Sequence, residues 1–197
     1  AVDTAGFEKD TYYLYRSQWN KASNTLHLVT AWDSDNMYTT GGKTPVVIYS
    51  NAPTVKLYRN GTLIGMATRK ANTSAAGHTY YTYTTTSNSS SVCTAVNASG
   101  SAGLYATFNV TYASGTISAK AYDANGTEIT ASCAGNTSVS TPGSVSKLNV
   151  SKDKEEIVAD GSSLSYITVD VTDANGILDT TATNLISFSL SGNGEIV

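Results

Sequence analysis

The chain has 197 residues, a formal net charge of -3 at pH 7, and only 14% charged residues. This balance, with no cluster of Lys and Arg, argues against a nucleic-acid-binding surface. No apolar run reaches the ~20 residues that span a bilayer, so we expect no membrane insertion in this segment. The abundance of Thr, Ser, Asn, Gly and Tyr is typical of all-β modules outside the cell, and we expect an extracellular or cell-surface protein.

Residues 10–19 are the one stretch with a helical pattern. Asp10 can cap the N-terminus of a helix through its side-chain oxygen. Tyr12, Tyr15 and Trp19 fall at i, i+3 and i+7 and form one apolar stripe,. A helix of about ten residues is marginal alone in water. We therefore expect this stripe to pack against a partner surface.

Alternating β-forming segments follow the helix. TLHLVTAW (25–32) is predicted to be the first strand,. Asn60-Gly61 is predicted to form the tip of a hairpin, because both residues tolerate positive φ. TISAKAYDANGTEITAS is read as a further hairpin that turns at residues 123–126. The remaining predicted strands are PVVIYSN, TVKLYR, TYYTYTTT, SVCTAV and LYATFNVTY.

A second module is predicted after a Gly/Ser/Thr/Pro linker, with the boundary near 140–145. Its four expected strands are KLNVS, EEIVA, LSYITVDVT and LISFSLS. An immunoglobulin-like (Ig-like) sandwich needs about seven strands, so this module should be incomplete, and its uncovered apolar face should tend to recruit other chains. The predicted fold is all-β: an N-terminal helical segment at 1–23, an Ig-like antiparallel β-sandwich at 24–143, and a partial second Ig-like module at 144–197.

Several motifs, in order, resemble the junction between the catalytic barrel and the following module in glycoside hydrolase family 2, the β-galactosidase family. The final barrel helix of that family is matched by Gly6, Phe7, Lys9, Asp10, Tyr12, Tyr13 and Trp19. A hairpin motif is matched by Tyr49, Ser50, Asn51, Val55, Leu57, Asn60, Gly61 and Gly65. A later strand is matched by Gly115, Ile117, Ala119, Ala121, Tyr122 and Gly126. Residues 146–197 resemble the start of a bacterial Ig-like, invasin-type module.

The resemblance implies that residues 1–23 are the terminal barrel-helix segment of a bacterial β-galactosidase-type enzyme, whose catalytic barrel would be the partner of this region. The parent would hydrolyse terminal β-galactosides. Two features depart from the family pattern. TAWDSD retains only Trp32 of an aromatic segment, and residues 66–110 are longer than expected and are interpreted as an insertion.

No catalytic residue is assigned to this chain. Retaining glycosidases need two carboxyl groups about 5–5.5 Å apart, and the resemblance places that pair of glutamates upstream. His27 and His78 have no second ligand at metal spacing,. The DSDN segment (33–36) lacks the distal Glu of a calcium loop. We therefore expect a non-catalytic fragment with no cofactor and no metal site.

Aromatic side chains give a second hypothesis, a carbohydrate-binding or adhesion module for galactose-containing glycans. Tyr and Trp offer a flat apolar face and a polar group to a sugar ring. Core packing is the competing explanation for the same side chains. The candidates are Trp32, Tyr38, Tyr80, Tyr81 and Tyr83.

The two cysteines, Cys93 and Cys133, also leave two alternatives open. An extracellular setting would allow one disulfide between them. Otherwise each is a small buried apolar side chain.

Overall fold

The computed structural model describes residues 1–33, 39, 41–97 and 100–197, which divide into two compact units, unit 1 (1–141) and unit 2 (142–197). The described chain is mostly antiparallel β-structure with one helix, α1 (Asp10–Trp19), which confirms the predicted fold class. No helix among the described residues has the length and apolar character that crossing a bilayer requires.

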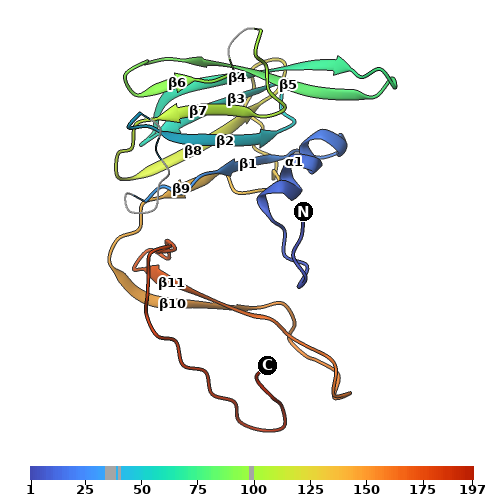
Figure 1. The fold of residues 1–197 in the computed structure, drawn as a ribbon, viewed down its shortest axis with the longest axis vertical. Helices are drawn as coiled ribbons and strands as arrows, with labels where there is room; N and C mark the ends of the chain where they lie inside the picture. Colours follow the sequence, from blue (N-terminus) through green and yellow to red (C-terminus); the bar gives the residue numbers. More distant parts are fainter. Residues whose placement is uncertain (34–38, 40, 98–99) are drawn as a thin grey trace. The chain divides into compact units, whose positions relative to one another are not determined.

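Unit 1 is a sandwich of two antiparallel sheets (Figure 1). The four-stranded sheet has the order β1 (Leu26–Val29), β2 (Thr44–Ser50), β7 (Ala106–Val110) and β6 (Cys93–Ala95). The five-stranded sheet has the order β5 (Thr79–Ser87), β4 (Thr62–Thr73), β3 (Thr54–Arg59), β8 (Thr116–Tyr122) and β9 (Ser138–Ser140).

The core lies between the two sheets because alternate residues of each strand point inward. In β2, for example, Val46 and Ile48 are fully buried while their neighbours are partly exposed. The same alternation holds in β7, where Phe108 is fully buried. The largest fully buried apolar side chains of the core are Trp32, Val46, Ile48, Val55, Leu57, Tyr83, Phe108, Val110 and Ile117.

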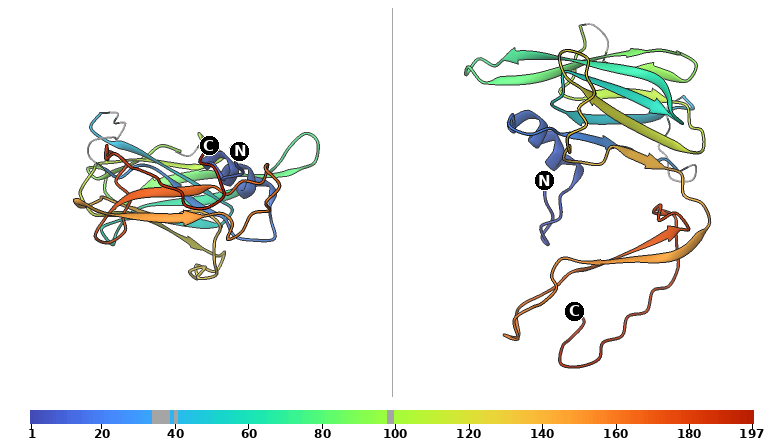
Figure 2. Two further views of the ribbon diagram at one scale, coloured as in Figure 1. Left: turned by 90° about the horizontal axis from the view of Figure 1, so that it is seen from below. Right: turned by 180° about the vertical axis from the view of Figure 1, so that it is seen from behind.

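Residues 66–110, which the sequence pattern indicates as an insertion, supply strands of the sandwich. They supply most of β4 and all of β5, β6 and β7, and therefore strands of both sheets. Tyr83 and Phe108 from this range are fully buried in the core. The β4–β5 hairpin pairs from Gly65↔Ser87 to Thr73↔Thr79, and its tip extends beyond the other strands at the end of the sandwich where α1 lies (Figures 1 and 2).

The predicted turn at Asn60-Gly61 is confirmed as the connection between β3 and β4. Asn60 has φ +50° and Gly61 has φ +77°, as a two-residue hairpin with both central residues at positive φ requires,. The Asn60 side chain accepts a hydrogen bond from the Thr116 amide at 2.7 Å and donates one to the Ser114 carbonyl at 2.9 Å. The turn is therefore fixed to the start of β8.

The two cysteines are free thiols, so the disulfide considered from the sequence is not formed. Cys93 lies on β6 opposite Val110 and is fully buried in the core. Cys133 lies in the connection after β8, partly buried, and its thiol donates to the Ala131 carbonyl at 3.7 Å. The two side chains occupy different packing environments, and burial raises the pKa of Cys93 to about 11.

Unit 2 has two strands, β10 (Val145–Lys152) and β11 (Ile167–Asp173), paired antiparallel. The strands predicted at EEIVA (155–159) and LISFSLS (185–191) are absent, although the structure describes all of residues 142–197. Every residue of β10 is exposed, so this pair of strands has no opposing layer to organise further strands,.

Candidate functional site

Helix α1 does not begin as the sequence predicts. Lys9 occupies the N-cap position and makes no side-chain capping bond, and Asp10 is the first helical residue. The carboxylate of Asp10 instead meets the ring of His27 on β1, with 2.8 Å between Oδ1 and Nε2. This tertiary contact replaces the expected local cap.

The predicted apolar stripe of α1 does not face the sandwich. Trp19 is 76% exposed and Tyr15 is 47% exposed, and their rings stack at a centroid distance of 4.9 Å. The face that packs on the sandwich instead carries Tyr13, whose ring stacks on His27 at 4.0 Å, and the fully buried Ser17. A short helix can bury one side, and polar contacts select that side here. We call the Tyr15–Trp19 side the aromatic face.

Gln18 is the second tie between α1 and the sandwich. Its Oε1 accepts from the Tyr81 amide at 2.8 Å, and its Nε2 donates to the carbonyls of Tyr81 at 3.1 Å and Leu104 at 3.0 Å. The Gln18 amide group therefore pairs with the backbone of β5 as a neighbouring strand would. Because β5 is the outer strand of its sheet, this contact covers part of an edge that would otherwise be open to other chains.

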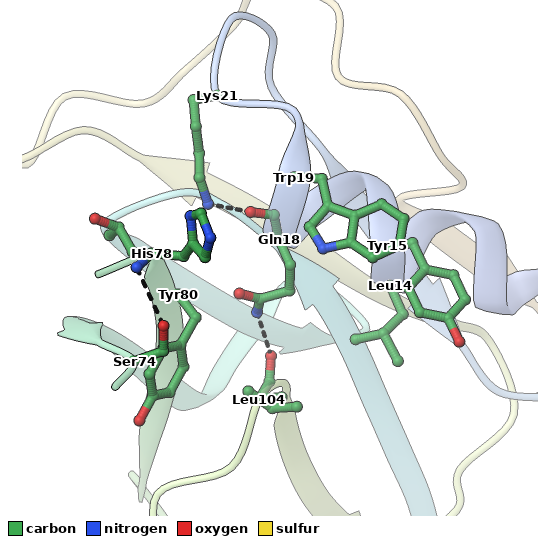
Figure 3. A pocket seen from close by; sticks show the side chains of 10 residues that line it. Leu14, Tyr15, Gln18, Trp19, Lys21, Ser74, His78, Tyr80 and Leu104 are labelled. Carbon is green, nitrogen blue, oxygen red and sulfur yellow. Dashed lines mark hydrogen bonds between the residues drawn. The ribbon is translucent and has the colours of Figure 1, made fainter. Parts of the chain in front are cut away.

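A pocket of about 770 Å³ lies between the C-terminal half of α1 and the β4–β5 hairpin (Figure 3). Trp19 and Tyr15 lie on one side of it, and Tyr80 and His78 on the other. Its lining residues are Leu14, Tyr15, Gln18, Trp19, Lys21, Ser74, His78, Thr79, Tyr80 and Leu104.

The structure does not bring together the aromatic residues proposed as a glycan platform. Trp32 and Tyr83 are core residues with 1% and 0% exposure, so neither ring is accessible to a ligand. The Tyr81 ring is covered by Lys21, whose Nζ lies 3.8 Å from the ring centroid, and by Arg69, whose Cζ lies 4.2 Å from it. Tyr80 is 37% exposed and lines the pocket.

Two sequence predictions concern a loop that lies mostly outside the described residues. Tyr38 and positions 34–36 of the DSDN segment are not among the described residues, whereas Asp33 is described and buried. Among the described residues, no group of three or more His, Cys, Asp or Glu side chains could hold a metal ion.

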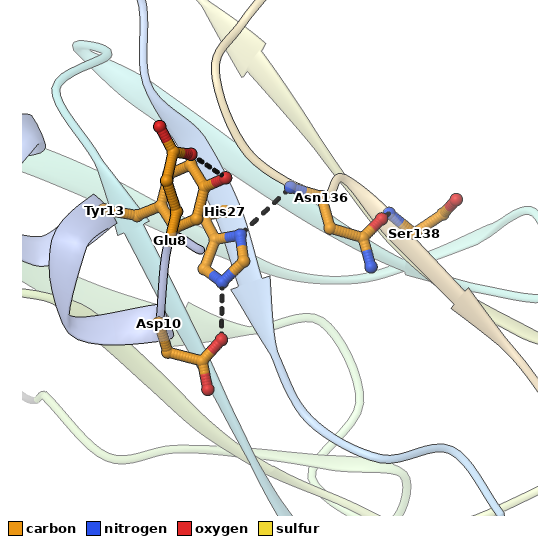
Figure 4. Close-up of polar contacts among 6 residues, drawn as sticks. All are labelled: Glu8, Asp10, Tyr13, His27, Asn136 and Ser138. Carbon is orange, nitrogen blue, oxygen red and sulfur yellow. Dashed lines mark hydrogen bonds and ion pairs between the residues drawn. The ribbon is translucent and has the colours of Figure 1, made fainter. Parts of the chain in front are cut away.

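His27 is the centre of a network that joins three segments of unit 1 (Figure 4). Its Nδ1 accepts a hydrogen bond from the Asn136 amide at 3.0 Å. Because Nδ1 accepts, the ring proton is on Nε2, which donates to Asp10. Beside the ring, the Tyr13 hydroxyl donates to Glu8 at 2.5 Å, and this bond raises the pKa of Tyr13 to about 12.

Comparison with known proteins shows what this chain is similar to. Residues 148–197 match the model described as glycoside hydrolase family 2 C-terminal domain 5, and residues 41–130 match a domain of unknown function, DUF4982. Beta-galactosidase BoGH2A from Bacteroides ovatus is 27% identical over 196 residues, which are 99% of this chain. These matches are consistent with the C-terminal region of a family 2 glycoside hydrolase.

Two further proteins are similar to this chain, one in sequence and one in fold. A putative beta-glucuronidase from Formosa agariphila is 42% identical over 65 residues, 33% of this chain and 6% of that protein. A solved structure of a glycosyl hydrolase family 2 member from Bacteroides cellulosilyticus has the same fold, with a TM-score of 0.61 and 24% identity over 92% of this chain and 22% of that one. The chain spans only 18% of the length of the Bacteroides ovatus protein.

Each glutamate of the chain is exposed at the surface of its unit. Glu8 accepts from Tyr13, Glu128 pairs with Lys120 at 3.1 Å, and Glu155 pairs with Lys152 at 2.6 Å. The sequence pattern does not indicate that Gln18 and His27 hold α1, or that Asn136 bonds to the His27 ring. The one available signal was a polar Gln within the helix, beside the aromatic stripe.

Proposed function

We propose that this chain is a non-catalytic accessory region of a secreted or cell-surface β-galactosidase-type glycoside hydrolase. The relative that matches the whole chain is described as a β-galactosidase, which supports terminal β-galactosides as the substrate of the parent enzyme. In this proposal, the sandwich of unit 1 packs against the catalytic barrel and spaces it from later modules.

The observation that carries the proposal is the aromatic face of α1. Burying one large apolar side chain stabilises a protein by about 1.5–3 kcal/mol, yet Trp19 is 76% exposed on a helix that Gln18 and His27 hold in place. Exposed apolar surface on an ordered element is typical of an interaction site. The proposed occupant is the catalytic barrel of the parent chain.

Oxidative footprinting with mass-spectrometric readout tests this contact, because the chain has two tryptophans in opposite environments. In the 197-residue chain, Trp19 should be labelled readily and Trp32, at 1% exposure, should be protected. In the full parent enzyme both should be protected. Equal labelling of Trp19 in the two proteins would exclude the contact.

A sugar-binding role is a second candidate, and the pocket beside α1 favours it. Tyr80 and Trp19 line this pocket together with the polar groups of Lys21, His78 and Gln18. Proteins commonly bind a sugar by stacking its ring on an aromatic side chain, while nearby polar groups form hydrogen bonds with the sugar hydroxyls. Calorimetric titration with galactose and galacto-oligosaccharides should then show binding that Trp19→Ala and Tyr80→Ala both abolish. If the titration shows only the heat of dilution, sugar binding is excluded and the accessory role remains.

A further inference from the structure

Residues 134–136 join the four-stranded sheet of unit 1 as an extra parallel segment beside β1. Leu26 donates its amide to the Ala134 carbonyl at 3.0 Å, and Leu28 donates to the Asn136 carbonyl at 2.7 Å. Two residues later, β9 begins and pairs with β8 in the five-stranded sheet. The segment from 134 to 140 therefore contacts both sheets at one edge of the sandwich.

One bond of this parallel ladder is replaced by a side chain. In a regular parallel pairing, the Asn136 amide would donate to a backbone carbonyl of β1, but it donates to Nδ1 of His27 at 3.0 Å. Glycine at position 135 allows the backbone to take this path, because Gly135 has φ +113°. A larger residue would not fit, since an added Cβ would lie 2.6 Å from Cβ of His27 and 2.7 Å from the Leu26 carbonyl oxygen. The backbone of residues 134–136 therefore packs closely against His27.

The same imidazole holds α1 through its other nitrogen. Nε2 donates to Asp10 at 2.8 Å, and Tyr13 covers one side of the ring. His27 is 7% exposed, so the ring itself is largely shielded from water. The titratable groups that face the ring are Asp10, Tyr13 and Glu8 from the helix side and Tyr49 from β2, whose ring centroid lies 6.3 Å away. Residues 134–136 carry no charged side chain.

We propose that His27 is a proton-sensitive tie in which protonation at Nδ1 releases the 134–136 segment and keeps α1 bound through Asp10. The neutral ring has one acceptor, and the Asn136 amide uses it. A second proton on Nδ1 places two N–H groups against each other, so the amide must move away. The other contact becomes an ion pair between the imidazolium and the Asp10 carboxylate, and is strengthened. The two partners of His27 therefore respond to acid in opposite directions.

The effect is expected to develop as the pH is lowered and the His27 imidazole takes up its second proton. Loss of this hydrogen bond removes the direct protection of the Asn136 amide against exchange. At about pH 5, relative to about pH 7.5, the Asn136 amide should exchange on the order of tenfold faster after correction for intrinsic chemistry. The amides of α1 should keep their protection.

Amide exchange followed by NMR on the 197-residue chain, with long-range 15N spectra of the ring, tests this proposal. His27→Asn keeps an acceptor at the Nδ1 position and loses the donor to Asp10, so Asn136 protection should become independent of pH while α1 loosens. His27→Gln keeps a donor toward Asp10 and loses the acceptor, so Asn136 should exchange fast at both pH values. His78→Gln replaces the other histidine, which is exposed. In this variant the pH dependence of Asn136 exchange should be the same as in the wild type.

Three results overturn the proposal. The first is a neutral ring with its proton on Nδ1. The second is Asn136 exchange that stays constant while the His27 ring titrates. The third is pH dependence at Asn136 that survives His27→Asn. Each is measured locally and does not depend on the role of the aromatic face, so this proposal and the proposed accessory function can fail separately.

Discussion

Gly65 on β4 lies directly against the ring of Phe108 on β7, across the interior of the sandwich. An added Cβ at Gly65 would lie 2.7 Å from Cε1 and 3.0 Å from Cδ1 of Phe108, and 3.3 Å from Sγ of Cys93. Gly65 does not have positive φ. Its requirement for glycine therefore comes from packing between the two sheets.

We expect Gly65→Ala to destabilise unit 1 by about 1–3 kcal/mol, the usual cost of an extra methyl group in a filled core. Phe108 is fully buried, and protein cores are close-packed, so movement of its ring would disturb its neighbours. Urea denaturation followed by far-ultraviolet circular dichroism measures the change. Thr62→Ala at the exposed start of the same strand is the control and should alter stability by less than about 0.5 kcal/mol.

The turn at Asn60-Gly61 gives a prediction based on backbone conformation. Gly61 has φ +77° and open space around it, so the strain from Gly61→Val is conformational and not steric packing. We expect a loss of about 1–2 kcal/mol, because a side chain with a branched Cβ resists the left-handed region. Gly61→Asn should cost much less, since Asn tolerates that region. Equal melting temperatures for the two variants would contradict the assigned turn.

Tyr83 should make the sandwich sensitive to alkali. Its buried hydroxyl contacts the carbonyls of Ser50 at 2.9 Å and Ala52 at 2.8 Å. Burial raises the pKa of Tyr83 above its ordinary value. Between about pH 10, where the unfolded side chain ionises, and the higher folded pKa, the native state holds more protons. The free energy of unfolding must therefore fall as the pH rises above about 10.

Tyr83→Phe is the matched variant for this alkaline effect. At pH 7 it should cost about 1–3 kcal/mol, because two buried carbonyls lose their donor. Above about pH 10 the difference from wild type should shrink by about 1.4 kcal/mol per pH unit, as long as the folded side chain stays protonated. Denaturation curves at several pH values measure this difference. A constant difference would mean that Tyr83 does not titrate differently on unfolding.

The two thiols should differ sharply in reactivity. Burial raises the pKa of Cys93 to about 11, and the side chain is fully enclosed, so little thiolate forms and no reagent reaches it,. Cys133 is partly exposed and should react first with a disulfide reagent. We expect one fast thiol in the native chain and two in denaturant, with Cys133→Ser removing the fast one. An intact mass that is lower than expected by two hydrogen atoms would indicate the disulfide that the structure lacks.

Gln18 should determine whether α1 stays attached to the sandwich. Gln18→Ala removes three hydrogen bonds to the backbone of Tyr81 and Leu104, each worth about 0.5–1.5 kcal/mol,. Amide exchange within α1 should accelerate markedly while exchange in the sheets changes little. Thr11→Ala, at an exposed position on the same helix, serves as the comparison. Protected α1 amides in Gln18→Ala would show that the His27 network alone holds the helix.

The sequence by itself determined the elements whose signals are local. Alternation in VVIYS and NVTY predicts strands because every second residue of a half-buried strand faces the core. Asn60-Gly61 predicts its turn because the two residues tolerate the dihedral angles that the turn needs. The order of motifs also indicated the C-terminal region of a family 2 enzyme, as the comparisons show.

Only the tertiary structure decided which side chains each pattern would bury. Periodicity cannot tell whether Tyr81, Tyr83 or Trp32 faces the core or solvent, because burial depends on the opposing sheet. The stripe of Tyr12, Tyr15 and Trp19 does not identify the face of α1 that contacts the sandwich, since Gln18 and Asp10 find partners that lie 63 and 17 residues away along the chain. In unit 2, strand-like segments such as LISFSLS remain without strand pairing. A strand needs a neighbour for its backbone hydrogen bonds, and no property of its own residues supplies one.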